Sequence, residues 1–327
     1  MIAGAVAQPG KRTTLTAFRL IAVPRNDFHL PSTLVEAIRR SVGDAQERTA
    51  EITSIREIGG GSISRSFLFG HQHGQWFVKI NTATRAGLFA AETDGLQALA
   101  ACSQIRVPQV FGQGCHDGYA FLVLEHLGLR PWRETGDGVI AGHALARLHG
   151  VIGEHFGWHR DNFIGSTPQH NAFASCWPDF FASQRLLPQI EWAKNHRASA
   201  KLIDRGQRLV ERMSVLFDDH QPAPSLVHGD LWYGNAAIDV SGRLALFDPA
   251  VYFGDREADL AMCRLFGGFP DAFFAAYGQA WPLPEGHVRR RTLYNLYHVL
   301  NHFNLFGGGY QDQAERMIDE LLADIGT

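Results

Sequence analysis

The chain has 327 residues, of which 45% are hydrophobic and 19% charged, which is enough apolar mass to form the core of one large domain or two smaller ones. Intrinsic disorder is excluded, because disordered chains are poor in aromatic residues and 11% of this chain is aromatic. The 30 Lys and Arg residues against 33 Asp and Glu give a formal net charge of -3, which argues against a nucleic-acid binder, since duplex binding relies on a basic face.

The first part of the chain predicts a small β-rich lobe. Residues 1–30 have no apolar signal core and are expected to form a weakly structured N-terminal extension. A short helix is predicted at 32–42, and short extended runs then alternate with turns, which predicts an antiparallel meander of five strands with one inserted helix. The predicted strands are at 55–58, 66–69, 76–80, 106–108 and 119–125, and the inserted helix is at 86–101.

A predicted hinge at 128–138 leads into a mostly helical region. Apolar residues recur at near-helical spacing in several segments, and a short non-helical island at 226–249 interrupts them. The predicted helices are at 139–149, 201–217, 293–303 and 317–325. We therefore predict an α+β fold with two lobes, an N-lobe at 31–127 and a larger, mainly helical C-lobe at 128–327, with a ligand cleft between them.

The sharpest chemical signal is the run His228–Asn235, HGDLWYGN, which is followed by an apolar run that ends at Asp248. An Asp with an Asn five positions later matches the catalytic loop of protein kinases, which also carry a metal-binding Asp further on. The Asp230 carboxylate could take the proton of an acceptor hydroxyl, and the oxygens of Asn235 and Asp248 suit Mg²⁺. Each of these residues alone could be an ordinary turn former, but the complete set favours phosphoryl transfer.

A second signal lies upstream, where Lys79 interrupts an apolar strand and Glu92 lies on the apolar stripe of the next helix. Each charge is costly to bury alone, and kinases pair such residues to anchor nucleotide phosphates. A snorkelling lysine and an edge glutamate are the alternative. The Gly60-Gly61-Ser62 turn could cradle phosphates with its backbone N–H groups, although an ordinary hairpin turn is the commoner meaning and the Gly-Lys-Ser/Thr ending of a Walker A loop is absent.

The sequence resembles the fructosamine-3-kinase (ketosamine-3-kinase) family, a branch of the aminoglycoside-phosphotransferase-like kinases, from about residue 30 to the C-terminus. The stretches that carry the resemblance are His228–Asn235, Asp248–Ala250, Tyr252–Ala261, Asp161–Gln169, Trp177–Phe181 and Arg185–Leu186. Many small-molecule kinases share the first of these. Trp232 and the stretches at 161–169 and 177–186 point to this particular branch.

The resemblance implies a protein-kinase-like fold and transfer of the ATP γ-phosphate, with Mg²⁺, to the third-carbon hydroxyl of a ketosamine such as a glycated lysine, free or protein-bound. The phosphorylated adduct is unstable, so the family is linked to protein deglycation. Asp230 would be the base, Asn235 and Asp248 would hold the metal, and the other implied contacts form three groups. These are Gly60, Gly61, Ser62, Lys79 and Glu92 at the phosphates, Glu125 and Leu127 at the adenine hinge, and Trp232, Asn162 and Arg185 at the acceptor.

Other activities remain open at this point. An aminoglycoside or choline acceptor would require a strongly acidic pocket, whereas the chain offers a mixed polar and aromatic set between the hinge and the catalytic loop. A nucleotide-binding pseudokinase would have lost some of the kinase residues, all of which are present. Trp232 could equally be a core tryptophan, and Asp259 is expected to accept hydrogen bonds from the catalytic loop rather than to catalyse.

The remaining candidates favour ordinary roles. The 4 cysteines include no Cys-x-x-Cys pair, so neither a zinc ribbon nor a disulfide scaffold is expected and a cytoplasmic location is predicted. No apolar run reaches the ~18 residues of a membrane helix. His155 and His159 lack a third metal ligand, and the 289–291 arginines are predicted to start a helix in solvent. A monomer or weak dimer is expected.

Overall fold

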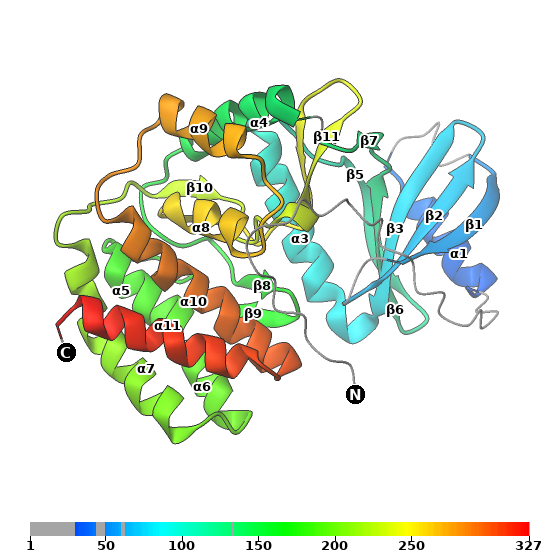
Figure 1. Ribbon diagram of the computed structural model, residues 1–327. Helices are drawn as coiled ribbons and strands as arrows, with labels where there is room; N and C mark the ends of the chain where they lie inside the picture. Colours follow the sequence, from blue (N-terminus) through cyan, green and yellow to red (C-terminus); the bar gives the residue numbers. More distant parts are fainter. Residues whose placement is uncertain (1–29, 44–49, 60–62, 133, 327) are drawn as a thin grey trace.

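The computed structural model describes residues 30–43, 50–59, 63–132 and 134–326 and has the α+β architecture with two lobes that the sequence predicts (Figure 1). A small β-sheet lobe lies beside a larger, mainly helical one. The Gly60-Gly61-Ser62 turn and most of the predicted N-terminal extension lie outside the described residues.

The N-lobe contains a five-stranded sheet in the order β1-β2-β3-β6-β5 with every neighbouring pair antiparallel. The strands are β1 Ile52–Ile58, β2 Arg65–His71, β3 Gly74–Thr82, β5 Val110–His116 and β6 Tyr119–Glu125. Helix α1, Ser32–Ser41, packs on one face of the sheet, mainly against β5, and shares a buried apolar cluster with Val78 and Ile80 of β3. Because side chains alternate along a strand, Lys79 points to the opposite face, where helix α3, Ala86–Ala100, packs.

One predicted strand of this sheet was wrong. Residues 105–106 form β4, which pairs in parallel with β12, Leu244–Leu246, in a separate sheet of order β4-β12-β11-β7. The fifth strand of the N-lobe is instead β5. Pro108 lacks the N–H that a ladder requires and ends the first segment, while two glycines in β5 weaken its sequence signal.

The C-lobe is built around helix α10, His287–Phe306, which packs against α6, α8 and α11. The other helices are α4 Glu134–His149, α5 Trp177–Phe181, α6 Leu187–Asn195, α7 Ala200–Arg212, α8 Glu257–Leu265, α9 Asp271–Ala280 and α11 Tyr310–Asp324. The short strands are β7 Leu129–Arg130, β8 Asn162–Ile164, β9 Thr167–Gln169, β10 Ser225–Val227, β11 Ala236–Asp239 and β13 Tyr252–Gly254. Helix α4 begins earlier than predicted and so shortens the predicted hinge.

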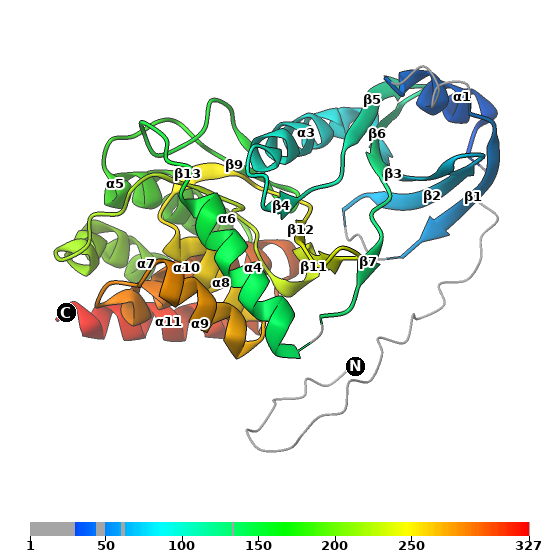
Figure 2. The same ribbon diagram turned by 90° about the horizontal axis from the view of Figure 1, so that it is seen from above.

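Helix α3 joins the lobes, as the view from above shows (Figure 2). Asp94 accepts a hydrogen bond from Trp158 Nε1 of the C-lobe at 2.6 Å. The backbone of Gly95 approaches Pro249 so closely that a Cβ at Gly95 would lie 3.0 Å from the Pro249 Cγ. The helix is therefore packed directly against the segment that carries Asp248.

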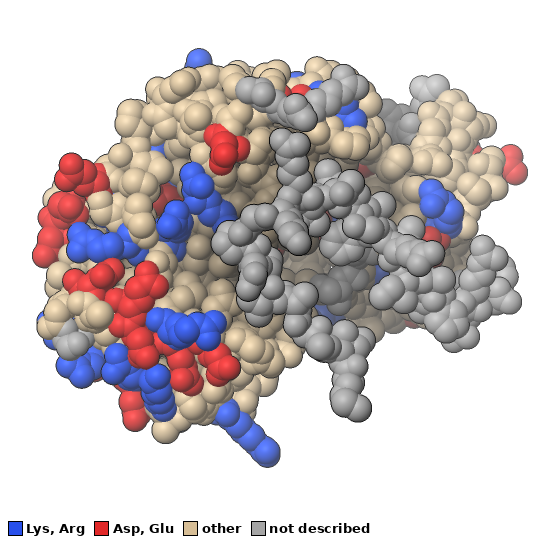
Figure 3. Space-filling view, in the orientation of Figure 1, with Lys and Arg blue, Asp and Glu red and all other residues tan. Residues whose placement is uncertain are grey.

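Charged side chains on the face in Figure 3 are intermixed over α7 and α11, where Lys201 and Arg205 both pair with Asp319. The predicted solvent exposure of Arg290 was wrong, because its side chain is fully buried and its Nε donates to Glu257 at 2.9 Å. None of the helices in the described part of the chain is both long and apolar enough to span a bilayer.

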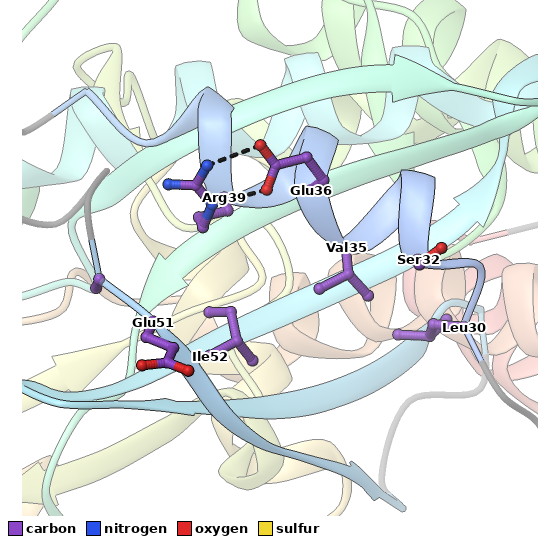
Figure 4. Close-up of a pocket in the computed structure, with 8 residues that line it drawn as sticks. Leu30, Ser32, Val35, Glu36, Arg39, Glu51 and Ile52 are labelled. Carbon is purple, nitrogen blue, oxygen red and sulfur yellow. Dashed lines mark hydrogen bonds and ion pairs between the residues drawn. The ribbon is translucent and has the colours of Figure 1, made fainter.

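A shallow hollow lies between α1 and the start of β1 on the outer side of the N-lobe (Figure 4). The apolar side chains of Leu30, Val35 and Ile52 line it, and so do Arg39 and Glu36, which pair with each other at 2.7 Å. None of the described residues that were predicted to carry chemistry lines this hollow.

Candidate active site

A cleft of about 980 Å³ between the lobes collects most of the residues that the sequence singled out. Its walls come from the N-lobe sheet, α3, the segment after β10, and the helices α8 and α10. The predicted site residues that line it are Lys79, Glu92, Glu125, Leu127, Asp230, Trp232, Asn235 and Asp248. Chain segments more than 150 residues apart thus meet in one cavity, as in the hydrogen bond between Lys79 and Asp248.

Lys79 is the one lysine or arginine among the described residues that line the cleft. Its Nζ donates to Glu92 Oε1 at 2.7 Å and also to Asp248. Burial lowers the pKa of Lys79, but the charges of Asp248 and Glu92 outweigh that effect and raise the pKa above its ordinary value. The ammonium therefore stays charged and fixed in place, where it can meet the phosphates of a nucleotide.

Asp230 and Asn235 lie together in the loop after β10. Asn235 Nδ2 donates to the Asp230 backbone oxygen at 2.9 Å and to its carboxylate at 3.1 Å. Burial raises the pKa of Asp230 to about 7, and the charge of Asp248 adds to that shift. A carboxylate with this pKa can accept a proton near neutral pH and release it again.

The same residues offer the oxygen ligands that a hard divalent cation prefers. Asn235 uses its amide nitrogen for both hydrogen bonds, so its amide oxygen is available to a cation, and the Asp248 side chain is half exposed. Carboxylate and amide oxygens are the usual protein ligands of Mg²⁺. The donor set therefore fits this metal.

Asp248 has an uncommon backbone conformation. Its φ of 56° lies in the left-handed region, which is rare for a residue other than glycine, and Pro249 follows it directly, although the residue before a proline favours extended backbone. Strained residues of this kind cluster at functional sites. Here the turn holds the Asp248 carboxylate against Lys79.

The carboxylate of Asp259, on helix α8, anchors the loop that carries Asp230. This carboxylate accepts hydrogen bonds from the backbone N–H groups of His228 at 2.7 Å and Gly229 at 2.9 Å, and it lies 3.1 Å from His149 Nε2. Burial raises the pKa of Asp259, but the hydrogen bonds and charges of the histidines lower it overall, so the group stays ionised. The predicted anchoring role of Asp259 is thus confirmed.

Gly229 has no room for a side chain. Its φ is 82°, and a Cβ there would lie 2.1 Å from the backbone oxygen of Ala250. Glycine is the residue that adopts this conformation without a steric cost. The loop can therefore pass directly over the segment after Asp248, which brings Asp230 and Asp248 into the same cavity.

Glu125 and Leu127 form part of the wall next to the N-lobe, where the chain crosses between the lobes. The Glu125 carboxylate is held by Arg106 and by the backbone N–H of Gln109 at 3.2 Å. The side chain of Glu125 is therefore engaged, and its backbone N–H also donates to the Gln109 oxygen at 2.8 Å. The contact of this segment with adenine stays a prediction.

Asn162 and Arg185 do not lie in the cleft wall, so their predicted contact with an acceptor is not supported by this geometry. Asn162 Nδ2 donates to the Val251 oxygen at 2.7 Å. Arg185 is completely buried, bonds Asn171 Oδ1 at 2.7 Å and lies 4.0 Å from the centre of the Tyr252 ring. Asn162 instead supports the backbone that follows Asp248, and Arg185 packs against the ring of Tyr252 in the same segment.

Sequence reasoning missed a second wall, formed by α10 and the end of α8. Its members are Met262, Phe266, His298, Asn301, His302, Leu305 and Phe306. Burial lowers the pKa of His298 to about 3, so its imidazole is neutral and can exchange hydrogen bonds with a hydroxyl. Polar residues at i, i+3 and i+4 on an otherwise apolar helix were the signal that could have revealed this wall.

Comparison with known proteins shows which family the chain belongs to. The fructosamine kinase family model matches residues 34–324. A probable ketoamine kinase from Synechocystis is 42% identical over 88% of this chain and 96% of its own length. The chloroplastic protein-ribulosamine 3-kinase of Arabidopsis thaliana is 35% identical over 91% of this chain and 92% of its own.

Solved structures agree with this assignment. A crystal structure from Haemophilus somnus, assigned as a fructosamine-3-kinase, superposes with a TM-score of 0.78 and 29% identity over 89% of this chain and 96% of that one. An aminoglycoside phosphotransferase with AMP-PNP and hygromycin B gives a TM-score of 0.61 at 13% identity, over 85% of this chain and 96% of that one. That likeness concerns the fold alone. By its sequence and its architecture, the chain belongs to the fructosamine kinase family.

Proposed function

We propose that this protein is an ATP-dependent kinase that phosphorylates the third-carbon hydroxyl of ketosamines, the adducts of sugars with amines. The observation that carries the proposal is the convergence of Asp230, Asn235, Asp248 and the Lys79–Glu92 pair on one cleft, in a member of the fructosamine kinase family. The presence of this complete set argues against a pseudokinase. The aminoglycoside alternative has only a likeness of fold.

Each residue has a distinct task in this reaction. Lys79, held by Glu92, anchors the nucleotide phosphates, and Asp230 orients the acceptor hydroxyl and takes its proton as the new oxygen–phosphorus bond forms. The bond between the γ-phosphorus and its bridging oxygen breaks, and ADP leaves. Asn235 and Asp248 would hold Mg²⁺, which supplies neutralisation of phosphate charge. Catalysis then rests on positioning and electrostatics, without a covalent enzyme intermediate.

An acceptor panel tests this function directly. ADP release should be measured with fructosyl-lysine, ribulosyl-lysine, a glycated peptide, hygromycin B and choline, and the sugar product should be analysed for phosphate on the third carbon. We expect turnover with the ketosamines and none with the last two acceptors. Turnover with hygromycin B or choline and none with any ketosamine would overturn the proposal.

The rate should depend on pH through Asp230. The carboxylate form is the active one, and its pKa is raised to about 7, so kcat/KM is expected to rise as the pH approaches 7 and to level off above it. The same raised pKa favours the neutral acid in the folded protein, so its contribution to stability is present at low pH and is lost as the pH rises through about 7. A profile of kcat/KM that rises near pH 4, the ordinary range of an aspartate, would contradict this assignment.

Replacement of Lys79 by Met should raise the KM for ATP by at least about tenfold, because a charge-assisted phosphate contact is lost. The buried Glu92 would also lose its partner. Lys79→Arg keeps the charge and should retain part of the affinity. Titration of ATP in initial-rate assays, with circular dichroism to verify folding, measures both variants, and an unchanged KM in Lys79→Met would show that Lys79 does not contact the nucleotide.

We further propose three properties that the sequence predicts: a cytoplasmic location, a monomer or weak dimer, and no nucleic-acid partner. Protein-bound ketosamines, such as glycated lysines on protein surfaces, are proposed as acceptors together with free ones. The proposed consequence for the cell is deglycation, because a ketosamine phosphorylated on the third carbon is unstable and releases its amine.

A further inference from the structure

The two sides of the cleft differ in charge. The acidic side chains among its described lining residues are Glu92, Glu125, Asp230 and Asp248. All of these come from the N-lobe, α3 or the loops after β10 and β12. The wall formed by α10 and the end of α8 contributes no carboxylate among the described residues that face the cavity. A cationic acceptor entering on this side would therefore meet uncharged groups.

This wall, together with Trp232 of the loop after β10, instead offers a group of rings, which we call the aromatic rim and define as Trp232, Phe266, His302 and Phe306. The ring centres of Phe266 and His302 are 5.1 Å apart, and those of His302 and Phe306 are 5.7 Å apart. Trp232 meets Phe266 edge-on at 6.4 Å. Phe266 is 46% exposed and Phe306 is 60% exposed, so the rim stands open at the mouth of the cleft.

His302 carries a defined hydrogen-bonding pattern within the rim. Its Nδ1 lies 2.8 Å from the backbone oxygen of His298, and because a carbonyl oxygen only accepts, Nδ1 must be the protonated nitrogen. In the Nδ1–H tautomer that this contact selects, Nε2 is the acceptor nitrogen. Tyr310 of α11 packs beside the same ring at 5.2 Å and helps to hold it.

Building on the proposed function, we propose that the aromatic rim binds the substituted ammonium group that links the sugar of a ketosamine to its amine-bearing partner. A secondary amine is cationic near neutral pH, and aromatic faces within about 6 Å attract such a cation. The Nε2 atom of His302 accepts one of its N–H groups. The rim therefore favours a ketosamine over the same sugar without the amine.

The position of the rim also accounts for how a large acceptor would fit. The sugar hydroxyls lie deeper, beside Asp230 and the buried His298 and Asn301, while the ammonium lies at the exposed rings. The alkyl chain beyond the nitrogen then points into solvent. An adduct on a lysine of a folded protein can thus present its sugar without a pocket for the polypeptide.

Two acceptors separate the rim from the rest of the site. Fructosyl-lysine carries the ammonium, whereas 1-deoxyfructose has the same third-carbon hydroxyl and no amine. For Phe306→Ala and for Phe266→Leu we expect the KM for fructosyl-lysine to rise by about 5- to 20-fold, the range of a partly desolvated cation–π contact, with kcat within about twofold. The kinetics with 1-deoxyfructose should stay as in the wild type. His302→Phe keeps a ring but removes the acceptor nitrogen, and should raise the same KM.

Phe173→Ala is the matched control, because Phe173 is an exposed phenylalanine, 57% accessible, that does not line the cleft. It should leave both KM values unchanged. If the rim variants change both acceptors equally, or neither, the rim does not recognise the ammonium, even though the kinase activity stands. If the wild-type protein phosphorylates no ketosamine at all, the proposed function itself fails, and that outcome is distinguishable from failure of the rim.

Discussion

Replacing Asp230 with Asn is expected to lower kcat by about 10²- to 10⁴-fold, the usual contribution of a positioned general base. The amide has nearly the same shape, but it cannot take the proton of the acceptor hydroxyl. Asp230 faces the cavity beside Asp248 and is hydrogen-bonded by Asn235. Because Lys79 and Asp248 remain, ATP should still bind. Steady-state ADP release and calorimetric titration of the nucleotide measure the two effects separately.

Asp312→Asn, at an exposed position of α11, is the matched control and should leave both quantities unchanged. Turnover that survives in Asp230→Asn would show that another group takes the proton. Loss of nucleotide binding together with turnover would instead indicate that Asp230 maintains the shape of the cleft.

The Asp259→Ala variant should lose about 3 to 5 kcal/mol of its free energy of unfolding, the cost of breaking a buried, hydrogen-bonded charge network. The backbone N–H groups of His228 and Gly229 would lose their acceptor, and both residues are buried. Removal of the carboxylate also frees the loop that positions Asp230. Urea denaturation followed by fluorescence gives the stability, and ADP release from the folded fraction gives the activity.

Asp259→Asn offers a milder test at the same position. Its amide oxygen can still accept one backbone hydrogen bond, so it should retain part of the stability that Asp259→Ala loses. Asp324→Ala, at the exposed end of α11, should change the stability by less than about 0.5 kcal/mol. An Asp259→Ala variant as stable as this control would rule out the anchoring role.

Most of the site could be predicted from the sequence, because the patterns that identify its residues are local. The spacing of Asp230 and Asn235 lies within one loop, and the alternation of β3 places Lys79 opposite Val78, toward α3. A buried charge demands a partner, and this demand correctly predicts the bond between Lys79 and Glu92. The two-lobed α+β fold follows from hydrophobic periods that change from strand-like to helical along the chain.

The errors arise where burial is decided by distant segments. Arg185 and Arg290 are fully buried, and their partners include aromatic rings from β13 and α10 for the first and Glu257 for the second. No local sequence pattern predicts such pairing, because arginine side chains are mostly exposed. The sequence analysis missed strand β5 for a related reason. This strand is stabilised by its pairing with β6 and by the packing of α1 near Gly112, rather than by strong strand formers in its own sequence.

The close packing of Gly95 against Pro249 has a consequence for control of the enzyme. In protein kinases, outward movement of the equivalent helix separates the lysine–glutamate pair and turns the enzyme off. Here Asp94 and Gly95 attach helix α3 to the C-lobe next to Asp248. An outward movement of the helix would therefore require the C-lobe to move with it. We therefore expect the Lys79–Glu92 pair to stay formed without bound nucleotide, so that the rate depends on the substrates rather than on movement of this helix.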